Sequence, residues 1–280
     1  MNKNDANISL SVIIPTYYRY KCLSALLDML TEQTYNGFEV IVSDQTPEID
    51  RPIDFYNKFH NKINLKVIYL KEPSLTKPRN IAVEHSKGEI LLFLDDDIII
   101  KENFIQSHVD IMFKENVDVV NGATTLKEDL PLEFPWDVRL LDPVRFFLVS
   151  PNHKWEGMTF SISSINVSMK KKNFLAVGGF DEKIPRMVDF ELGYRLYKSG
   201  AKIYFSYRPF ARHLRGDGGS RKNPENYNKL VSAIYIHRKH FPGWITTQYI
   251  LKLFLTRKRY LLFPWRVYFS WIKVGKLLQK

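Results

Sequence analysis

The chain has 280 residues, of which 45% are hydrophobic and 14% aromatic, and this composition excludes an intrinsically disordered chain. The single cysteine, Cys22, excludes an internal disulfide framework and a zinc site built from cysteines, which indicates a reducing cytoplasm. The N-terminal pattern is not typical of a signal peptide, and no run of ~18 uncharged apolar residues predicts a membrane-spanning helix.

The net charge of +11 is concentrated towards the C-terminus. From residue 201 onwards there are 17 Lys or Arg and two acids, Asp217 and Glu225, whereas the first 200 residues carry 24 bases and 28 acids. A basic tail behind a nearly neutral body predicts an anionic partner, either a membrane surface or a nucleic acid.

The first hundred residues alternate between strand-like and helix-like patterns. Apolar runs predict strands at residues 10–14, 38–42, 65–70 and 90–94. A leucine stripe at helical spacing, from Leu23 to Leu30, predicts a helix after the first strand. Residues 78–85 predict another, with Pro78 in its first turn. Apolar strands separated by helices favour a parallel sheet that is covered on both faces.

The second half is less regular. It predicts a loop at 131–151, strands at 160–169 and 203–205, and helices at 171–177, 188–198 and 226–240. From Trp244 onwards apolar and basic residues alternate, which predicts a helical tail.

Polar residues follow directly on three of the predicted strands: Thr16, Asp44 and the run Asp95-Asp96-Asp97. Parallel sheets bind ligands at the carboxyl ends of their strands, so we expect these residues to converge. Three adjacent carboxylates repel one another unless a cation or solvent neutralises them, which favours a divalent metal site. The alternative is an acidic loop that caps the next helix, whose start we expect near Asn103.

Five motifs in order resemble the family 2 glycosyltransferases with the A-type fold. They are Ser11-Val-Ile-Ile-Pro-Thr16, Glu39-Val-Ile-Val-Ser-Asp44, Pro78-Arg-Asn80, Gly88-Glu-Ile-Leu-Leu-Phe-Leu-Asp-Asp-Asp97 and Gly178-Gly-Phe-Asp181. The resemblance runs from about residue 9 to 213. It implies an α/β fold with a mainly parallel central sheet, helices on both faces and a C-terminal helical appendage. Residues 1–240 would form the catalytic domain, with a nucleotide-binding half (1–120) and an acceptor half (121–240), and residues 241–280 the basic aromatic tail.

The resemblance also assigns roles to particular residues. A nucleotide sugar, most simply a UDP-sugar, would be bound by Pro15, Thr16, Tyr18, Asp44, Arg79, Asp95, Asp96, His213 and Arg215. Asp95 and Asp97, with His213, would bind a divalent metal, Mn²⁺ or Mg²⁺, and Asp97 is the expected direct ligand. Asp189 would be the general base. The chain departs from the family pattern at Ser43, where an acid is usual, and at Val188, where a Glu often precedes the base.

Several of these residues also have a purely structural explanation or a competitor for the same role. Asp189 is also explained as an acid favoured by a helix N-terminus, and Glu191 competes with it as the base. His213 is explained equally well as a structural residue. It precedes a glycine-rich stretch, 216–220, that suits a mobile lid over phosphates.

On the acceptor side, Trp155, Met158 and Asn166 belong to a segment expected to face the acceptor. Core filling is as good an explanation for Trp155. Residues 178–181 predict a tight turn in which glycine supplies positive φ.

We therefore expect a metal-dependent inverting glycosyltransferase that acts on a saccharide or lipid-linked acceptor in cell-surface polysaccharide synthesis. One rival is a sugar nucleotidyltransferase, but residues 16–20 lack the glycine-rich loop that it requires. Another is a non-catalytic nucleotide-sugar or saccharide-binding module on the same fold.

The basic aromatic tail has three interpretations. It forms interfacial helices on an anionic membrane, it packs back on the domain, or it binds nucleic acid. We favour the membrane, which predicts a cytoplasmic protein at the inner face of the cell membrane. No nucleic-acid partner is expected, because no recognised binding motif accompanies the charge.

Overall fold

The computed structural model describes residues 9–125, 154–214, 226–256 and 265–279. The predicted loop at 131–151, the glycine-rich stretch and Arg215 lie outside these residues. The strands are β1 (Leu10–Thr16), β2 (Phe38–Asp44), β3 (Leu65–Tyr69), β4 (Ile90–Leu94), β5 (Ile98–Ile99), β6 (Val119–Thr125), β7 (Glu156–Thr159), β8 (Asn166–Lys170) and β9 (Ile203–His213). The helices are α1 (Tyr20–Thr31), α2 (Asn57–His60), α3 (Lys77–Glu84), α4 (Phe104–Lys114), α5 (Lys171–Ala176), α6 (Val188–Lys198), α7 (Asn226–His240), α8 (Gly243–Thr256) and α10 (Trp265–Leu278), with a short 3₁₀ turn η2 (Glu48–Asp50).

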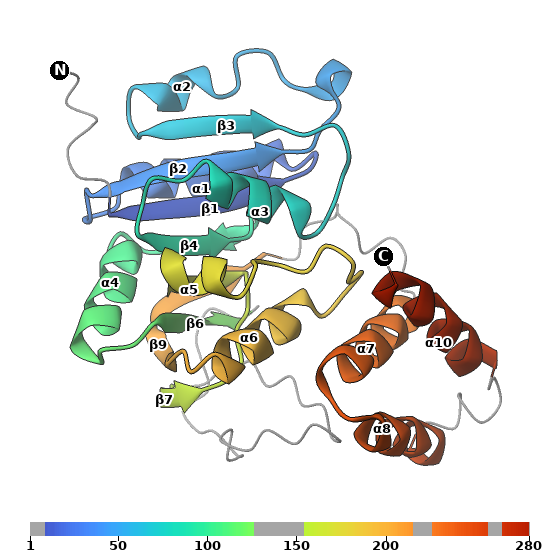
Figure 1. The fold of residues 1–280 in the computed structure, drawn as a ribbon. Helices are drawn as coiled ribbons and strands as arrows, with labels where there is room; N and C mark the ends of the chain where they lie inside the picture. The colour runs from blue at the N-terminus through green and yellow to red at the C-terminus, as the bar shows by residue number, and fades with distance from the viewer. Residues whose placement is uncertain (1–8, 126–153, 215–225, 257–264, 280) are drawn as a thin grey trace.

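The strands form one nine-stranded sheet in the order β3-β2-β1-β4-β8-β6-β9-β5, with β7 paired to β9. The pairs β1–β2, β1–β4, β2–β3 and β6–β9 are parallel, whereas β8, β5 and β7 run antiparallel to their neighbours. The expected α/β fold with a mainly parallel sheet is confirmed. Figure 1 shows the sheet with its helices, and with α7, α8 and α10 gathered to one side.

Two apolar cores flank the sheet because successive strand side chains point to opposite faces. In β1, Ile13 packs on one face, while Val12 and Ile14 pack on the other. The first face is covered by α3, α5, α6 and α7, and the second by α1, α2 and α4. Strand β4 in the middle of the sheet is therefore apolar throughout, and β1 is nearly so, which is the pattern that the sequence carries.

The segment predicted as one strand at 160–169 is a strand only from Asn166 onwards, where β8 begins, and residues 160–165 connect β7 to β8. The amide of Ser163 donates to the Asn121 side chain at 3.0 Å, and that of Asn166 donates to the carbonyl of Ser163 at 3.0 Å. These bonds turn the chain between β7 and β8, so the prediction of a continuous strand is wrong. The predicted strand at 203–205 is also too short, because β9 continues along β6 to His213.

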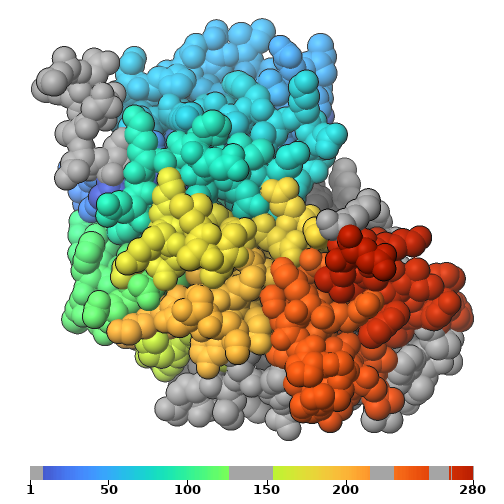
Figure 2. Space-filling view, in the orientation of Figure 1, coloured from blue at the N-terminus to red at the C-terminus, as the bar shows by residue number. Residues whose placement is uncertain are grey.

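The C-terminal helices pack on the body rather than standing apart from it. Helix α7 contributes to the same core as α6 and also contacts α8 and α10. The guanidinium of Arg238 on α7 lies over the Trp271 ring of α10, 4.3 Å from its centroid. Figure 2 shows these helices, orange to red, against the gold acceptor half. In the described part of the chain, no helix combines the length and apolar character needed to cross a membrane.

Candidate active site

The carboxyl ends of β1, β2 and β4 bring three predicted polar groups to one edge of the sheet. Thr16 and Asp44 are register partners at the ends of β1 and β2, and Asp95 to Asp97 follow β4 directly. The hydroxyl of Thr16 donates to Oδ2 of Asp96 at 2.7 Å, although 80 residues separate them. The convergence predicted from the sequence is therefore present.

A cavity of about 490 Å³ opens at this edge. Its walls are Pro15, Thr16, Tyr17, Arg19, Gln45, Pro73, Ser74, Leu75, Arg79, Asp95, Asp96, Pro185 and Arg186. Five of these are predicted nucleotide-sugar residues: Pro15, Thr16, Arg79, Asp95 and Asp96. The sequence reasoning missed Arg19, Gln45 and Arg186. A signal existed for Arg19, a cation only three residues after Thr16.

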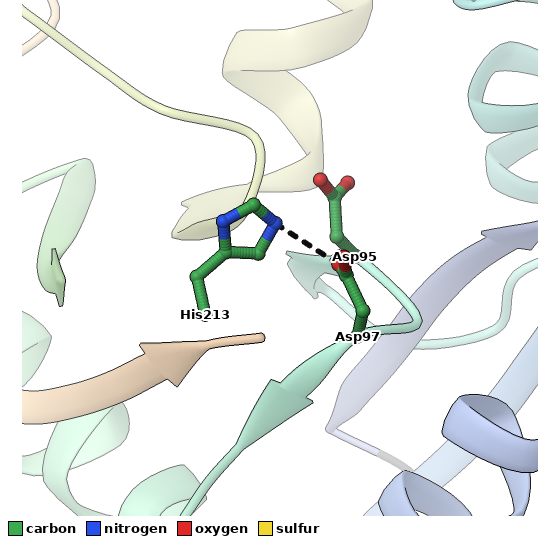
Figure 3. Close-up of side chains that lie close together, drawn as sticks. All are labelled: Asp95, Asp97 and His213. Carbon is green, nitrogen blue, oxygen red and sulfur yellow. Dashed lines mark ion pairs between the residues drawn. The ribbon is translucent and has the colours of Figure 1, made fainter. Parts of the chain in front are cut away.

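Asp95, Asp97 and His213 can each direct one ligand atom into a group whose atoms all lie within 4.8 Å of one another. Strand β5 creates this meeting, because it follows Asp97 at once and pairs with the end of β9, where His213 lies. The Nε2 atom of His213 is 3.0 Å from Oδ1 of Asp97, as Figure 3 shows. That Oδ1 atom is buried and accepts no hydrogen bond from the described residues. Two carboxylates and an imidazole whose ligand atoms converge in this way fit a divalent cation.

Two arginines hold the same carboxylates. Arg79 donates to Oδ1 of Asp95 at 2.6 Å, and Arg19 donates to Oδ1 of Asp96 at 2.8 Å and to Oδ2 of Asp97. Burial raises the pKa of Asp96 to about 7, even though Arg19 and Thr16 act in the opposite direction. Burial also acts to raise the pKa of Asp97, but His213 and Arg19 outweigh it and hold that pKa below its ordinary value.

Three predicted nucleotide residues in the described part of the chain do not lie in the cavity wall: His213, which contacts Asp97 instead, Asp44 and Tyr18. Asp44 is fully buried, and its Oδ2 accepts hydrogen bonds from the hydroxyls of Tyr20 at 2.7 Å and Tyr56 at 2.9 Å. Its neighbour Gln45 lines the cavity instead. The hydroxyl of Tyr18 donates to Asp50. Contact of Asp44 or Tyr18 with a nucleotide stays a prediction.

Asp189 lies in the first turn of α6, where the sequence placed it. Its Oδ1 atom is buried and accepts no hydrogen bond from the described residues. Burial raises its pKa against opposing effects of Ser164 and Arg79, while the charge of Asp95 adds to the rise. Met187, just before α6, has a positive φ of 62°, a costly conformation for a residue with a side chain. The strained turn leads directly into the candidate base.

Glu191, the competing base, is fully buried and fully engaged. Its Oε1 accepts from Arg195, Lys239 and His240, each at 2.8 Å, and its Oε2 accepts from Arg195 at 2.6 Å. Burial alone would raise the pKa of Glu191, but His240 and Arg195 outweigh it and lower this pKa to about 2. These contacts join α6 to α7 and leave no oxygen for a substrate, so they favour Asp189 as the base.

The acceptor segment divides into packing and exposed residues. Trp155 stacks on Phe205 with ring centroids 5.6 Å apart, which supports the core-filling alternative, while Met158 is half exposed. Asn166 is fully buried and donates to the carbonyls of Ala123 and Pro209. The amide of Asn166 is therefore used inside the sheet, and the expectation that its segment faces the acceptor stays a prediction.

The predicted turn at 178–181 is present. Gly178 and Gly179 have φ of 78° and 67°, the conformation that glycine adopts without strain. The Asn80 side chain accepts from the amide of Phe180 at 2.9 Å and donates to its carbonyl at 2.9 Å. This turn therefore ties the segment before α6 to α3, which also carries Arg79.

The sequence of the chain matches a known family of enzymes. The model of the glycosyl transferase family 2 matches residues 11–173, and the chain belongs to that family. Among the most similar relatives is the poly(ribitol-phosphate) beta-N-acetylglucosaminyltransferase TarS of Staphylococcus aureus, which is 35% identical over an alignment of 156 residues. That alignment covers 50% of this chain and 26% of TarS. A validoxylamine A glucosyltransferase of Streptomyces hygroscopicus is 29% identical over 70% of this chain and 53% of its own length. The chain thus spans about a quarter to a half of the length of these curated relatives.

Solved structures share the fold. Residues 1–349 of S. aureus TarS, in complex with UDP-GlcNAc, align over 97% of this chain and 81% of that one, with a TM-score of 0.67 and 19% identity. A mannosyltransferase of Pyrobaculum calidifontis, in complex with GDP-Man and Mn²⁺, aligns over 99% of this chain and 75% of that one, with a TM-score of 0.61 and 16% identity. The A-type glycosyltransferase fold predicted from the sequence is confirmed.

Proposed function

We propose that this chain is a metal-dependent inverting glycosyltransferase that uses a nucleoside-diphosphate sugar. The observation that carries the proposal is the convergence of Asp95, Asp97 and His213 beside a cavity that Thr16 and Arg79 also line. A cavity of this size, with carboxylates for a cation and guanidiniums for phosphate oxygens, suits a nucleoside diphosphate better than a neutral sugar alone.

The proposed donor is a UDP-sugar. TarS has been crystallised with UDP-GlcNAc, and a second structural neighbour, GalNAc-T7, with UDP, GalNAc and Mn²⁺. The P. calidifontis enzyme, crystallised with GDP-Man, makes a guanine nucleotide the alternative. In this chain Gln45 lines the cavity, its Oε1 accepts from the amide of Ser74 at 2.6 Å, and its Nε2 makes only a long bond of 3.5 Å to the carbonyl of Thr16. We assign the remaining donor capacity of Nε2 to a base contact beside the predicted Asp44.

In the proposed reaction the acceptor hydroxyl attacks the anomeric carbon of the donor, and the bond from that carbon to the diphosphate oxygen breaks with inversion. The proton of the hydroxyl passes to Asp189, whose raised pKa favours its acceptance. Arg79 and Arg19 supply positive charge to the departing diphosphate. A divalent cation held by Asp95, Asp97 and His213 would add to that charge.

The proposed acceptor is a saccharide or lipid-linked polymer at an anionic membrane surface. On α10, Trp265, Tyr268, Phe269 and Ile272 recur at helical spacing and are 37–62% exposed. The opposite face of α10, with Val267 and Val274, is buried in the core. Residues 226–280 contain 11 Lys or Arg and no acid. An exposed aromatic stripe within a strongly basic region is typical of interfacial helices.

The test is donor turnover with Mn²⁺, with Mg²⁺ and with a chelator, over a panel that includes UDP-GlcNAc and GDP-mannose. We expect metal-dependent release of nucleoside diphosphate that falls at least ~10²-fold in Asp97→Ala. Asp110→Asn, an exposed carboxylate of α4, is the matched control and should leave turnover unchanged. Turnover that persists in Asp97→Ala sinks the mechanism, and tight UDP binding without any turnover indicates a non-catalytic module.

A further inference from the structure

Each carboxylate of the candidate metal site is already paired with an arginine. Arg79 holds Asp95, and Arg19 bridges Asp96 and Asp97. Both guanidiniums also line the cavity. The donor set that suits a divalent cation therefore has two positive charges at its edge.

These charges act at short range in a poorly solvated place. The side chains of Arg19, Arg79 and Asp97 are 22%, 5% and 2% exposed. Charges a few ångströms apart near a protein interior interact several times more strongly than in water. A cation that enters beside Asp97 is thus repelled by Arg19 as well as attracted by the carboxylates. A diphosphate in the cavity brings negative charge that offsets this repulsion.

Arg19 need not leave for a cation to bind. It donates to Oδ2 of Asp97, whereas Oδ1 of the same carboxylate faces His213 and accepts no hydrogen bond from the described residues. Arg19 and a cation can therefore occupy different oxygens of one carboxylate. While both are bound, each raises the free energy of the other, unless an anion lies between them or beside them.

We propose that Arg19 is a positioning residue that makes divalent-cation binding depend on the nucleoside diphosphate. It holds Asp96 and Asp97 in place before the donor arrives, and it keeps the affinity of the protein for the cation low until the diphosphate is present. The inference rests on the proposed function, because it assumes that the cavity takes a nucleoside diphosphate with a metal. Such coupling is reciprocal, so the cation strengthens diphosphate binding by the same factor.

The experiment is a titration of Mn²⁺ into the full chain, followed by the electron paramagnetic resonance signal of free Mn²⁺, with and without saturating UDP. For the natural chain we expect Mn²⁺ to bind about tenfold or more tightly with UDP than without it. In Arg19→Gln, Mn²⁺ alone should bind several-fold more tightly, and the UDP effect should shrink to about twofold. Weaker binding of Mn²⁺ alone by Arg19→Gln, or an unchanged UDP effect, would overturn the proposal.

Two further variants separate charge from shape. Arg19→Lys keeps the charge and should keep most of the UDP effect, although a lysine cannot bridge two carboxylates as a guanidinium does. If Arg19→Lys is folded but has lost the UDP effect on Mn²⁺ binding, as Arg19→Gln has, the role of Arg19 is purely structural and the proposal fails.

Arg186→Gln removes another cation that lines the cavity, and the backbone amide of Arg186 donates to the hydroxyl of Ser232. It should weaken UDP binding without changing the affinity for Mn²⁺ alone, and equal behaviour of the two glutamine variants would overturn the specific role of Arg19.

The two levels of proposal fail in different ways. A natural chain that binds no Mn²⁺, with UDP or without it, contradicts the metal-dependent function itself. A natural chain with strong coupling that Arg19→Gln retains contradicts only the role of Arg19. Thermal melting of each variant reports whether the chain is folded before the titration is interpreted.

Discussion

Two clusters in which arginines hold acidic side chains differ in whether a ligand can reach the carboxylates. At the donor edge, Arg19 and Arg79 hold Asp95 to Asp97 beside a cavity, and Oδ1 of Asp97 accepts no hydrogen bond from the described residues. At the junction of α6 and α7, both oxygens of Glu191 are occupied by Arg195, Lys239 and His240. The first cluster faces a cavity, and the second is closed.

The difference separates binding from structure. A buried carboxylate oxygen without a partner costs free energy, and a ligand that supplies the missing contact recovers it. A buried carboxylate whose oxygens are all paired gains nothing from a ligand, but it holds together the elements that carry its partners. Asp189 belongs to the first kind and Glu191 to the second. Asp97 lies between them, because its Oδ1 has the His213 contact and no paired hydrogen bond among the described residues.

The largest effect is expected for Asp189→Asn. An amide cannot accept the acceptor proton, so kcat should fall by ~10²–10⁴-fold, while binding of UDP and Mn²⁺ is retained. The thermal midpoint should not fall, because the variant removes a buried charge with an unpaired oxygen. Steady-state kinetics and calorimetry measure the two quantities, with Asp28→Asn on the exposed side of α1 as the control. A variant within tenfold of the natural kcat means that Asp189 is not the base.

Glu191→Gln should show the reverse pattern. Breaking a buried charge network leaves cations without their partner and costs roughly 3–5 kcal/mol, so denaturant titration should show a large loss of stability. The kcat of the fraction that remains folded should stay within a few-fold of the natural value. If turnover is lost while the thermal midpoint is kept, Glu191 is the base, and its assignment as a structural residue is wrong.

The same network predicts how stability depends on pH. In the folded chain the pKa of Glu191 is lowered to about 2, whereas a glutamate in the unfolded chain titrates near 4.3. A depressed pKa adds stability that is fully present above the unfolded value and is lost as the pH falls towards the folded value. We expect acid to remove about 3 kcal/mol between roughly pH 4.5 and 2. Urea titrations across this range should show a smaller loss in Glu191→Gln, and an equal loss would remove Glu191 as a cause.

The sequence predicts the donor half well because that half is built from local patterns. Apolar runs mark β1 to β4, and the rule for strand ends brings Thr16 to Asp96. What escapes prediction depends on side chains from elsewhere in the chain. Tyr20 and Tyr56 draw the Asp44 carboxylate inwards. Nothing in the spacing of residues indicates where that carboxylate points.

The region from α6 to α7 depends more on contacts between distant segments. The bounds of α6 and α7 follow from their periodicity, and Arg195 is visible as the i+4 partner of Glu191. However, Lys239 and His240 reach Glu191 from nearly 50 residues away. The sequence therefore leaves Asp189 and Glu191 as rival bases, and only the packing of α7 on α6 distinguishes them.

The smallest expected effect concerns the exposed face of α10. Trp265→Ser with Phe269→Ser removes two half-exposed aromatic side chains and should lower partitioning onto vesicles that contain anionic lipid by about thirtyfold, at ~1 kcal/mol each. The control is Phe113→Ser on α4, which removes an aromatic residue that is 71% exposed but lies outside the basic region. Co-sedimentation with vesicles of phosphatidylglycerol and phosphatidylcholine measures the effect. Equal binding of the natural chain and the double variant to the anionic vesicles would contradict membrane docking through this face. Equal binding of the natural chain to anionic vesicles and to vesicles of phosphatidylcholine alone would contradict it too, and either result would leave α10 with only its packing on α7.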